Sequence, residues 1–349
     1  MTPARQPPTT SKGNDFLASL EGKVRQQLAS RKVAYLLGAG VSYLDGQGYP
    51  LAASLWETIR ELVPTPERAE IQGKLDAGAS GLENALDLLD PGDVVERPHR
   101  RLVTEAIAQR FLQVAPPLEA HRRFLRRLSQ RNELSVPVFT LNYDCLLEQA
   151  ADLEGRRLTD GFAGVESRFL APNQFHEAVA LVLAGRRRAA QWQCGLVHLL
   201  KLHGSLNWFA LSSGDVRSLP LHSRAPDGAR RLMIPPQHRK AADSTVPPYA
   251  ALWSEFRGLL RHGPKLINRL VVVGYGMQDE HVNVVIESAM SRTDFTLLLL
   301  SKTLTPEAFQ RWGSKPNVIV VTESVSSLYG QHGTGHSWLW DFTKLTLEV

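Results

Sequence analysis

Two short polar motifs of this chain carry side chains that could do chemistry. Asn142 and Asp144 lie in the run Thr-Leu-Asn-Tyr-Asp, and His203 begins the run His-Gly-Ser. An imidazole titrates near neutral pH and suits proton transfer, whereas an amide or a carboxylate can position a water molecule or orient a leaving group. The glycine-rich segments 38–42 and 274–276 would let the backbone approach the phosphates of a nucleotide. These residue types indicate a ligand-binding crevice that contains a proton-transfer group.

Each motif also has a purely structural interpretation. Asn142 and Asp144 could cap the helix that is expected to follow them, and His203 could be a satisfied loop histidine. The glycines of segment 38–42 could form a plain tight turn, since Tyr43 replaces the third glycine of the usual phosphate-binding fingerprint. The residue types alone leave both interpretations open.

The expected strands are the elements that would position these motifs. Short, continuously apolar runs alternate with helical segments, which is typical of strands buried on both faces. We expect strands at Val33–Leu37, Val136–Leu141, Val197–Leu202, Arg231–Ile234, Leu270–Val273, Phe295–Leu300 and Val318–Val321. This alternation predicts an α/β fold with a doubly wound parallel sheet. Because ligands bind at the carboxyl ends of parallel strands, the first glycine loop, Asn142, Asp144 and His203 should converge on one crevice.

Long inserts and a tail complete the expected organisation. Two inserts, at about 55–131 and 153–193, are expected to be mostly helical and to form a layer over the ligand edge of the sheet. Segment 214–248 is expected to be loop with one short strand. Residues 1–13, rich in Pro and Thr, are expected to be a disordered tail, and residues 14–349 a single domain.

Composition limits the class of protein. The 349 residues are 43% hydrophobic and 21% charged, and no apolar run approaches the roughly 20 residues of a membrane span, so a cytoplasmic protein is expected. The two cysteines, Cys145 and Cys194, supply neither a disulfide scaffold nor a four-cysteine zinc site. The net charge of +5 includes basic runs at 122–127 and 186–188. These runs predict either solvated helix faces or a surface for nucleic acid or an acidic partner.

Taken in order, four motifs resemble those of the SIR2 family, and most closely its branch of SIR2-like bacterial defence proteins. They are Gly38-Ala39-Gly40-Val41-Ser42, Thr140-Leu141-Asn142-Tyr143-Asp144, Lys201-Leu202-His203-Gly204-Ser205 and Gly274-Tyr275-Gly276, the last extended by Asp279, His281 and Asn283. With their strands they span residues 33–283. The resemblance implies a Rossmann-like domain of the SIR2 type that binds NAD.

The resemblance also assigns roles to single residues. The NAD phosphates would be held by the first loop, through Gly38, Ala39, Gly40 and Ser42. Asn142 would lie beside the nicotinamide ribose, Asp144 would bond the carboxamide, and His203 would be the catalytic base. The adenosine half would be supported by Gly274, Tyr275 and Gly276.

Two departures separate this chain from protein-deacylating sirtuins. Those enzymes carry the two CxxC pairs of a zinc ribbon after the HGS motif, whereas here no cysteine follows Cys194. Where they have GIPDFR, residues 48–53 read Gly-Tyr-Pro-Leu-Ala-Ala. The resemblance therefore implies an NAD hydrolase without zinc, which releases nicotinamide and ADP-ribose or a cyclic form as a toxic effector of anti-phage defence. A deacylase is the less favoured alternative.

Other functions and partners stay open at the level of sequence. The chain could instead be a non-catalytic subunit that senses NAD or ADP-ribose within a nucleic-acid-associated complex. No sensor domain is recognised after the last motif, so we expect control by a partner or by assembly into a homo-oligomer. In similar systems the partner is a separately encoded ATPase or a short Argonaute-type protein.

Overall fold

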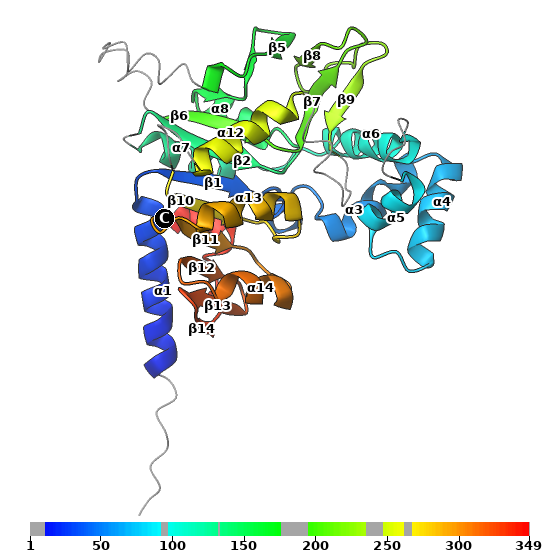
Figure 1. Ribbon diagram of the computed structural model, residues 1–349. Coiled ribbons are helices and arrows are strands. Elements are labelled where there is room, and N and C mark those ends of the chain that lie inside the picture. The colour runs from blue at the N-terminus through cyan, green and yellow to red at the C-terminus, as the bar shows by residue number, and fades with distance from the viewer. Residues whose placement is uncertain are drawn as a thin grey trace, which may run out of the picture.

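The structure is a computed structural model that describes residues 11–91, 97–131, 133–175, 195–234, 247–261 and 267–348. Within these residues a nine-stranded sheet forms the centre of the molecule (Figure 1). Its order is β14 (Gln331–Thr334), β13 (Val325–Leu328), β12 (Val318–Val321), β11 (Thr296–Leu300), β10 (Arg269–Val273), β1 (Val33–Leu37), β2 (Ser135–Thr140), β6 (Leu196–Lys201) and β3 (Leu158–Thr159). All neighbours from β12 to β3 pair in parallel, whereas β13 and β14 extend one edge as antiparallel strands.

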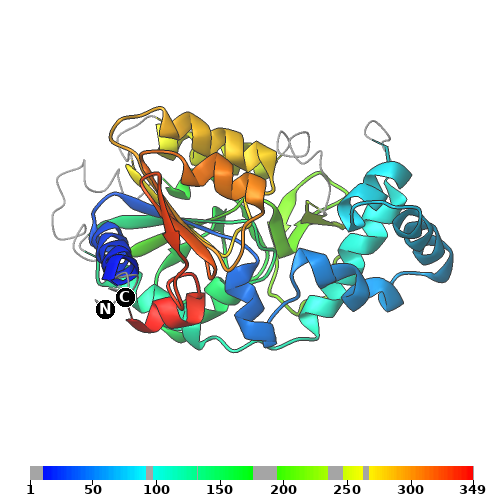
Figure 2. The ribbon, with the colours of Figure 1, turned by 90° about the horizontal axis from the view of Figure 1, so that it is seen from below.

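Helices cover both faces of this sheet (Figure 2). One face packs against α12 (Tyr249–Arg261), α13 (Glu280–Met290) and α14 (Pro306–Gly313). The other packs against α1 (Ser11–Ala29), α7 (Glu119–Ser129), α8 (Leu146–Leu153) and α15 (Phe342–Glu348). Along β1, Ala34 and Leu36 join the first core, while Val33, Tyr35 and Leu37 join the second, as the two-residue period of a strand requires. The predicted doubly wound α/β fold is confirmed, and six of the seven predicted strands lie in this sheet within one residue of their expected bounds.

A second, antiparallel sheet was not predicted. Its order is β4 (Phe162–Ala163), β5 (Arg168–Leu170), β8 (Val216–Ser218), β7 (Gly204–Ala210) and β9 (Arg230–Met233). The strand expected at 231–234 therefore exists, but it pairs with β7 in this second sheet. Gly204, at φ +85°, lets the chain leave β6 and enter β7 at once.

The second insert, expected to be mostly helical between 153 and 193, contains three short strands in its described part. The helix α8 ends at Leu153, and the strands β3, β4 and β5 follow it by residue 170. These strands have only two or three residues, too few for a two-residue alternation to stand out from a helical pattern. Residues 176–194 lie outside the described residues.

The first insert is helical, as expected, and forms a lobe at the right of Figure 1. It contains α3 (Ala52–Ile59), η2 (Arg60–Leu62), α4 (Thr65–Asp76), α5 (Leu82–Leu89) and α6 (Pro98–Leu112). The preceding α2 (Gly40–Tyr43) and η1 (Leu44–Gly46) follow β1, and their Val41 and Leu44 join the core of the sheet instead. The core of the lobe includes Cys145, Leu146 and Leu206, which follow the carboxyl ends of β2 and β6. The lobe thus adjoins the edge where ligands bind in such folds. The last part of the expected insert, α7, packs on the sheet instead because Phe124, Leu125 and Leu128 join the core there.

Two further expectations concern the amino terminus and the basic runs. The tail expected at 1–13 overlaps α1, which begins at Ser11. In α7, Arg122 and Arg126 bind Glu154, while Arg123 and Arg127 donate to backbone carbonyls of α15. These arginines therefore serve contacts within the fold. The second basic run, 186–188, lies outside the described residues. Among the described helices, none is long and apolar enough to cross a membrane.

Candidate functional site

The four sequence motifs meet at neighbouring strand ends. In the sheet β10, β1, β2 and β6 are adjacent and parallel, so their carboxyl ends share one edge. Thr140 pairs with Lys201 in register, so Asn142 and His203 each stand two residues beyond this pair. Adjacent strands lie about 4.8 Å apart, which makes these two residues neighbours across one strand spacing. The motifs therefore share one edge of the sheet, as expected, but the cavity lined by Asn142 and Asp144 does not include His203, so the expected single crevice is found only in part.

Close packing explains the glycines of the first loop. A Cβ on Gly38 would lie 2.6 Å from the carbonyl oxygen of Gly274, and one on Gly40 would lie 2.7 Å from the Cα of Gly274. Gly274 itself adopts φ +66°, which favours glycine. The loops after β1 and β10 thus touch backbone to backbone, and larger residues would force them apart.

Four amides of this loop already donate to backbone carbonyls, namely the amides of Gly38, Gly40, Val41 and Ser42. Gly38 N–H donates to Val273, Gly40 N–H to Gly274 at 2.8 Å, and Ser42 N–H to Ala39. A phosphate held here would have to share or replace these bonds. Tight packing alone therefore accounts for the glycines, and their role in holding phosphates stays a prediction.

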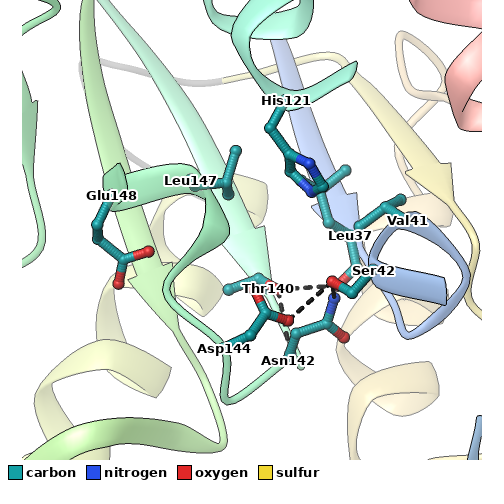
Figure 3. A pocket seen from close by; sticks show the side chains of 9 residues that line it. All are labelled: Leu37, Val41, Ser42, His121, Thr140, Asn142, Asp144, Leu147 and Glu148. Atoms are coloured by element: carbon teal, nitrogen blue, oxygen red, sulfur yellow. Dashed lines mark hydrogen bonds between the residues drawn. The ribbon is translucent and has the colours of Figure 1, made fainter. Parts of the chain in front are cut away.

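Ser42, Asn142 and Asp144 form a hydrogen-bonded cluster (Figure 3). The Oγ of Ser42 donates to Oδ2 of Asp144 at 2.7 Å. The Nδ2 of Asn142 donates to that Oγ and to the carbonyl of Gly38, both at 2.9 Å. The three side chains line one small cavity together with Thr140, and two of them, Ser42 and Asp144, are buried. The sequence placed these polar groups correctly at one edge, and the structure joins them directly.

Asp144 also caps the following helix. Its Oδ1 accepts from the amide of Leu146 at 3.1 Å, at the start of α8. One carboxylate oxygen therefore has the structural role, while the other contacts Ser42 in the cavity. For Asn142 the bonds run to the first loop instead of to α8.

His121 is a cavity residue that the sequence did not single out. It lies on α7, is 1% exposed, and its ring points toward the Ser42 end of the cavity in Figure 3. Its Nδ1 is buried without a hydrogen-bond partner among the described residues. Burial lowers the pKa of His121 to about 4, against a smaller opposing effect of Asp144, so the imidazole is neutral at pH 7. A neutral ring with an unsatisfied nitrogen can bond to a polar ligand group or a water molecule.

Lys201 is a second residue that the sequence did not single out. It is 0% exposed, and its ammonium donates to the carbonyl of Asp144 at 2.5 Å, to Ser205 at 2.7 Å and to Glu148 at 2.8 Å. Burial opposes its charge, but the negative charges of Glu148 and Asp144 raise the pKa of Lys201 above its ordinary value. A charged lysine thus fixes the loop that carries Asn142 and Asp144.

Cys145 lies in the same buried group. Burial raises the pKa of its thiol to about 12, so it is neutral at physiological pH. A neutral, fully buried thiol is a packing residue and a poor nucleophile.

His203 lies outside the lining of this cavity and contacts α13. Its Nε2 lies 3.2 Å from Nε2 of His281, and the two rings stack with centroids 5.3 Å apart. The ring of Trp253 on α12 also contacts the ring of His281, with the two ring centroids 4.9 Å apart. His203 is 3% exposed. The structure therefore pairs the predicted base with a histidine of the last motif.

The last glycine motif, residues 274–276, makes contacts within the fold through Tyr275. Tyr275 is buried, and its hydroxyl accepts from the amide of Asp279 at 2.8 Å and donates to the side chain of Asn283 at 3.4 Å. At Gly276 a Cβ would meet only the side chain of Gln278, at 3.8 Å.

In the described parts of the chain, no group of three His, Cys, Asp or Glu side chains could hold a metal ion.

Comparison with known proteins gives one family. The profile of a family described as "SIR2-like domain" matches residues 136–321, just over half of the chain. No curated protein matches. Similar solved structures include a SIR2 homologue with NAD, at 16% identity and TM-score 0.49 over 94% of each chain. A SIR2 homologue variant with 2′-O-acetyl-ADP-ribose gives 17% and 0.46 over 93% of this chain and 96% of that one.

Proposed function

The chain belongs to the SIR2-like domain family, and we propose that it binds NAD and hydrolyses the bond between nicotinamide and ribose. The observation that carries this proposal is the Ser42–Asn142–Asp144 cluster, which lines one cavity at the strand edge where dinucleotides bind in such folds. Asn142 and His203 each follow the in-register pair Thr140–Lys201 by two residues.

Each residue of the cluster has a role in this reaction. The phosphates lie along Gly38, Ala39, Gly40 and Ser42, and the adenosine half lies against Gly274, Tyr275 and Gly276. Asp144 orients the nicotinamide carboxamide, and its charge is favourable beside a cationic ring. Asn142 positions the attacking water molecule.

The chemistry requires little acid catalysis. The nicotinamide ring of NAD is already a cation, so the bonding electron pair leaves with neutral nicotinamide. The oxygen of water forms the new bond to the anomeric carbon, and His203 takes the proton that water loses. The products are nicotinamide, ADP-ribose and one proton, or nicotinamide and a cyclic product where a group of the substrate replaces water.

The variants His203→Ala and Asn142→Ala test this proposal. We expect each to stay folded and to lose NAD turnover by at least about 100-fold, the contribution of a well-placed base or positioning group. Nicotinamide release, with products identified by mass, measures the effect. The exposed His222, changed to Ala, is the matched control and should keep full activity. Full turnover by either site variant would remove that residue from the mechanism.

A non-catalytic NAD or ADP-ribose sensor is the second candidate. It is favoured by one observation: His203 faces His281 and does not line the cavity of Asn142 and Asp144. Calorimetric binding of NAD without nicotinamide release, at every protein concentration tried, would support the sensor and overturn the hydrolase.

We further propose a toxic role in anti-phage defence, in the cytoplasm, under control of a partner or of self-assembly. The support is the resemblance of the four motifs to defence proteins. Turnover that rises steeply with protein concentration would support assembly as the switch. Unchanged cellular NAD during phage infection would contradict the defence role.

A further inference from the structure

The pairing of His203 with His281 has a chemical consequence. Two Nε2 atoms 3.2 Å apart form a hydrogen bond when one of them carries a hydrogen and the other a lone pair. The bond therefore has two possible directions, in which either His203 or His281 carries the hydrogen on Nε2. A histidine whose Nε2 carries the hydrogen keeps its lone pair on Nδ1, and this nitrogen is then the base.

We propose that His281 is a positioning residue for His203. It accepts the Nε2–H of His203 and so holds this ring in the tautomer whose Nδ1 takes the proton from water. The inference rests on the proposed function, because it treats His203 as the base. His281 acts through His203 and is not itself a base toward the substrate.

Burial makes such an acceptor valuable. His203 is 3% exposed, so the positive charge it gains with the proton has little access to water. A hydrogen bond from a charged donor is stronger than one from a neutral donor, so the bond to His281 strengthens as the charge develops. The interaction is therefore greater in the transition state than in the resting site, which is the condition for a contribution to rate.

The surroundings of His281 hold its ring in place. It is the second residue of α13, and its ring packs against both His203 and Trp253. Trp253 in turn donates from Nε1 to the carbonyl of Leu202, the residue directly before His203. The helices α12 and α13 thus both orient the base, although they follow it by many residues in the chain.

The variants His281→Gln and His281→Leu separate hydrogen bonding from packing. The amide oxygen of Gln can accept the same bond, whereas Leu fills space without accepting. We expect His281→Leu to lower kcat about 100-fold, the loss that misplacement of a reacting group produces, with KM within about twofold. His281→Gln should recover most of this loss. Val284→Ala, at a 55% exposed position of the same helix, is the control and should leave both constants unchanged.

A spectroscopic measurement tests the proposal without turnover. Nitrogen NMR of labelled imidazoles distinguishes a ring nitrogen that carries hydrogen from one that carries a lone pair. We expect a hydrogen on Nε2 of His203 in the wild type and in His281→Gln, and mixed tautomers in His281→Leu. An unchanged His203 signal in His281→Leu, or full kcat in that variant, would overturn the positioning role. Absence of NAD cleavage by the wild type would instead overturn the proposed function, and the NMR result would still decide the pairing.

Discussion

The two sides of the candidate site are built in different ways. In the loops that follow β1 and β2, the side chains of Ser42, Asn142 and Asp144 are joined by hydrogen bonds. The ammonium of Lys201 donates to the backbone carbonyl of Asp144 in the second of these loops. After β6, the side chain of His203 meets α13 through a hydrogen bond and a ring contact. The first side is part of the folded core, whereas the second depends on a helix from a later part of the chain. Substitutions on the first side should therefore affect stability as well as rate, whereas those on the second should affect mainly rate.

Removal of Lys201 is the strongest challenge to this comparison. In Lys201→Met, the carboxylate of Glu148, whose side chain is 18% exposed, and the carbonyl of Asp144 lose their charged donor. We expect a loss of about 3–5 kcal/mol in the free energy of unfolding, as when one member of a buried ion pair is removed. Urea denaturation measures it. Lys344→Met, at a residue whose side chain is 55% exposed, is the control and should change stability by less than about 1 kcal/mol. If Lys201→Met also changed the free energy of unfolding by less than about 1 kcal/mol, the loop that carries Asp144 would not depend on the ammonium of Lys201.

The buried ring of His121 predicts a pH effect on the same side. The pKa of His121 is lowered to about 4, whereas an unfolded histidine titrates near 6.5, so the unfolded chain binds the proton first. Its contribution to stability is complete above pH 6.5 and is lost as the pH falls toward 4, by up to about 3 kcal/mol. His121→Gln removes this titration, so the variant should lose less stability than the wild type over that window. Denaturation midpoints at several pH values between 4 and 7 test the difference, and parallel curves would contradict the assignment.

His99 in the helical lobe supplies an internal control of opposite sign. Burial alone would lower its pKa, but hydrogen bonds to Asp90 and Glu70 raise it. A raised pKa in the folded state stabilises at low pH, and this stabilisation is lost as the pH rises through the folded value. The His99→Gln variant should therefore lose stability mainly at low pH, the reverse of His121→Gln.

The sequence predicted the parallel sheet because its strands carry a strong signal. A strand buried on both faces must be continuously apolar, as Leu270–Val273 and Val318–Val321 are, and such runs differ from surface helices. The carboxyl ends of those strands then placed Asn142 and His203 at one edge without further information. The short strands β4, β5 and β8 carry no comparable pattern, because each has only two or three residues and the pairing of β5 with β8 joins segments distant in the chain.

The missed site residues show what a sequence can hide. His121 stands among four arginines, where it looks like part of a charged helix. Its spacing from Phe124, Leu125 and Leu128 does place it on the apolar face of α7, and that signal could have found it. Lys201 ends an apolar strand, and only its neighbours in space reveal a buried charge. The pairing of His203 with His281 joins residues 78 apart in the chain, and no local pattern predicts it.

A matched pair of hydrogen-bond deletions gives the finest test of the comparison. Ser42→Ala removes the donor to a buried carboxylate, and Trp253→Phe removes the donor to the neutral carbonyl of Leu202. Bonds to charged groups contribute about 1.5–3 kcal/mol and neutral ones about 1 kcal/mol, so Ser42→Ala should be the more destabilising. Trp253→Phe should instead lower kcat, because it loosens the residue before His203. Denaturation midpoints and NAD turnover of both variants separate the two effects. If Trp253→Phe lost more stability than Ser42→Ala, or kept full kcat, the division between a side fixed by the fold and a side tuned by α12 and α13 would not hold.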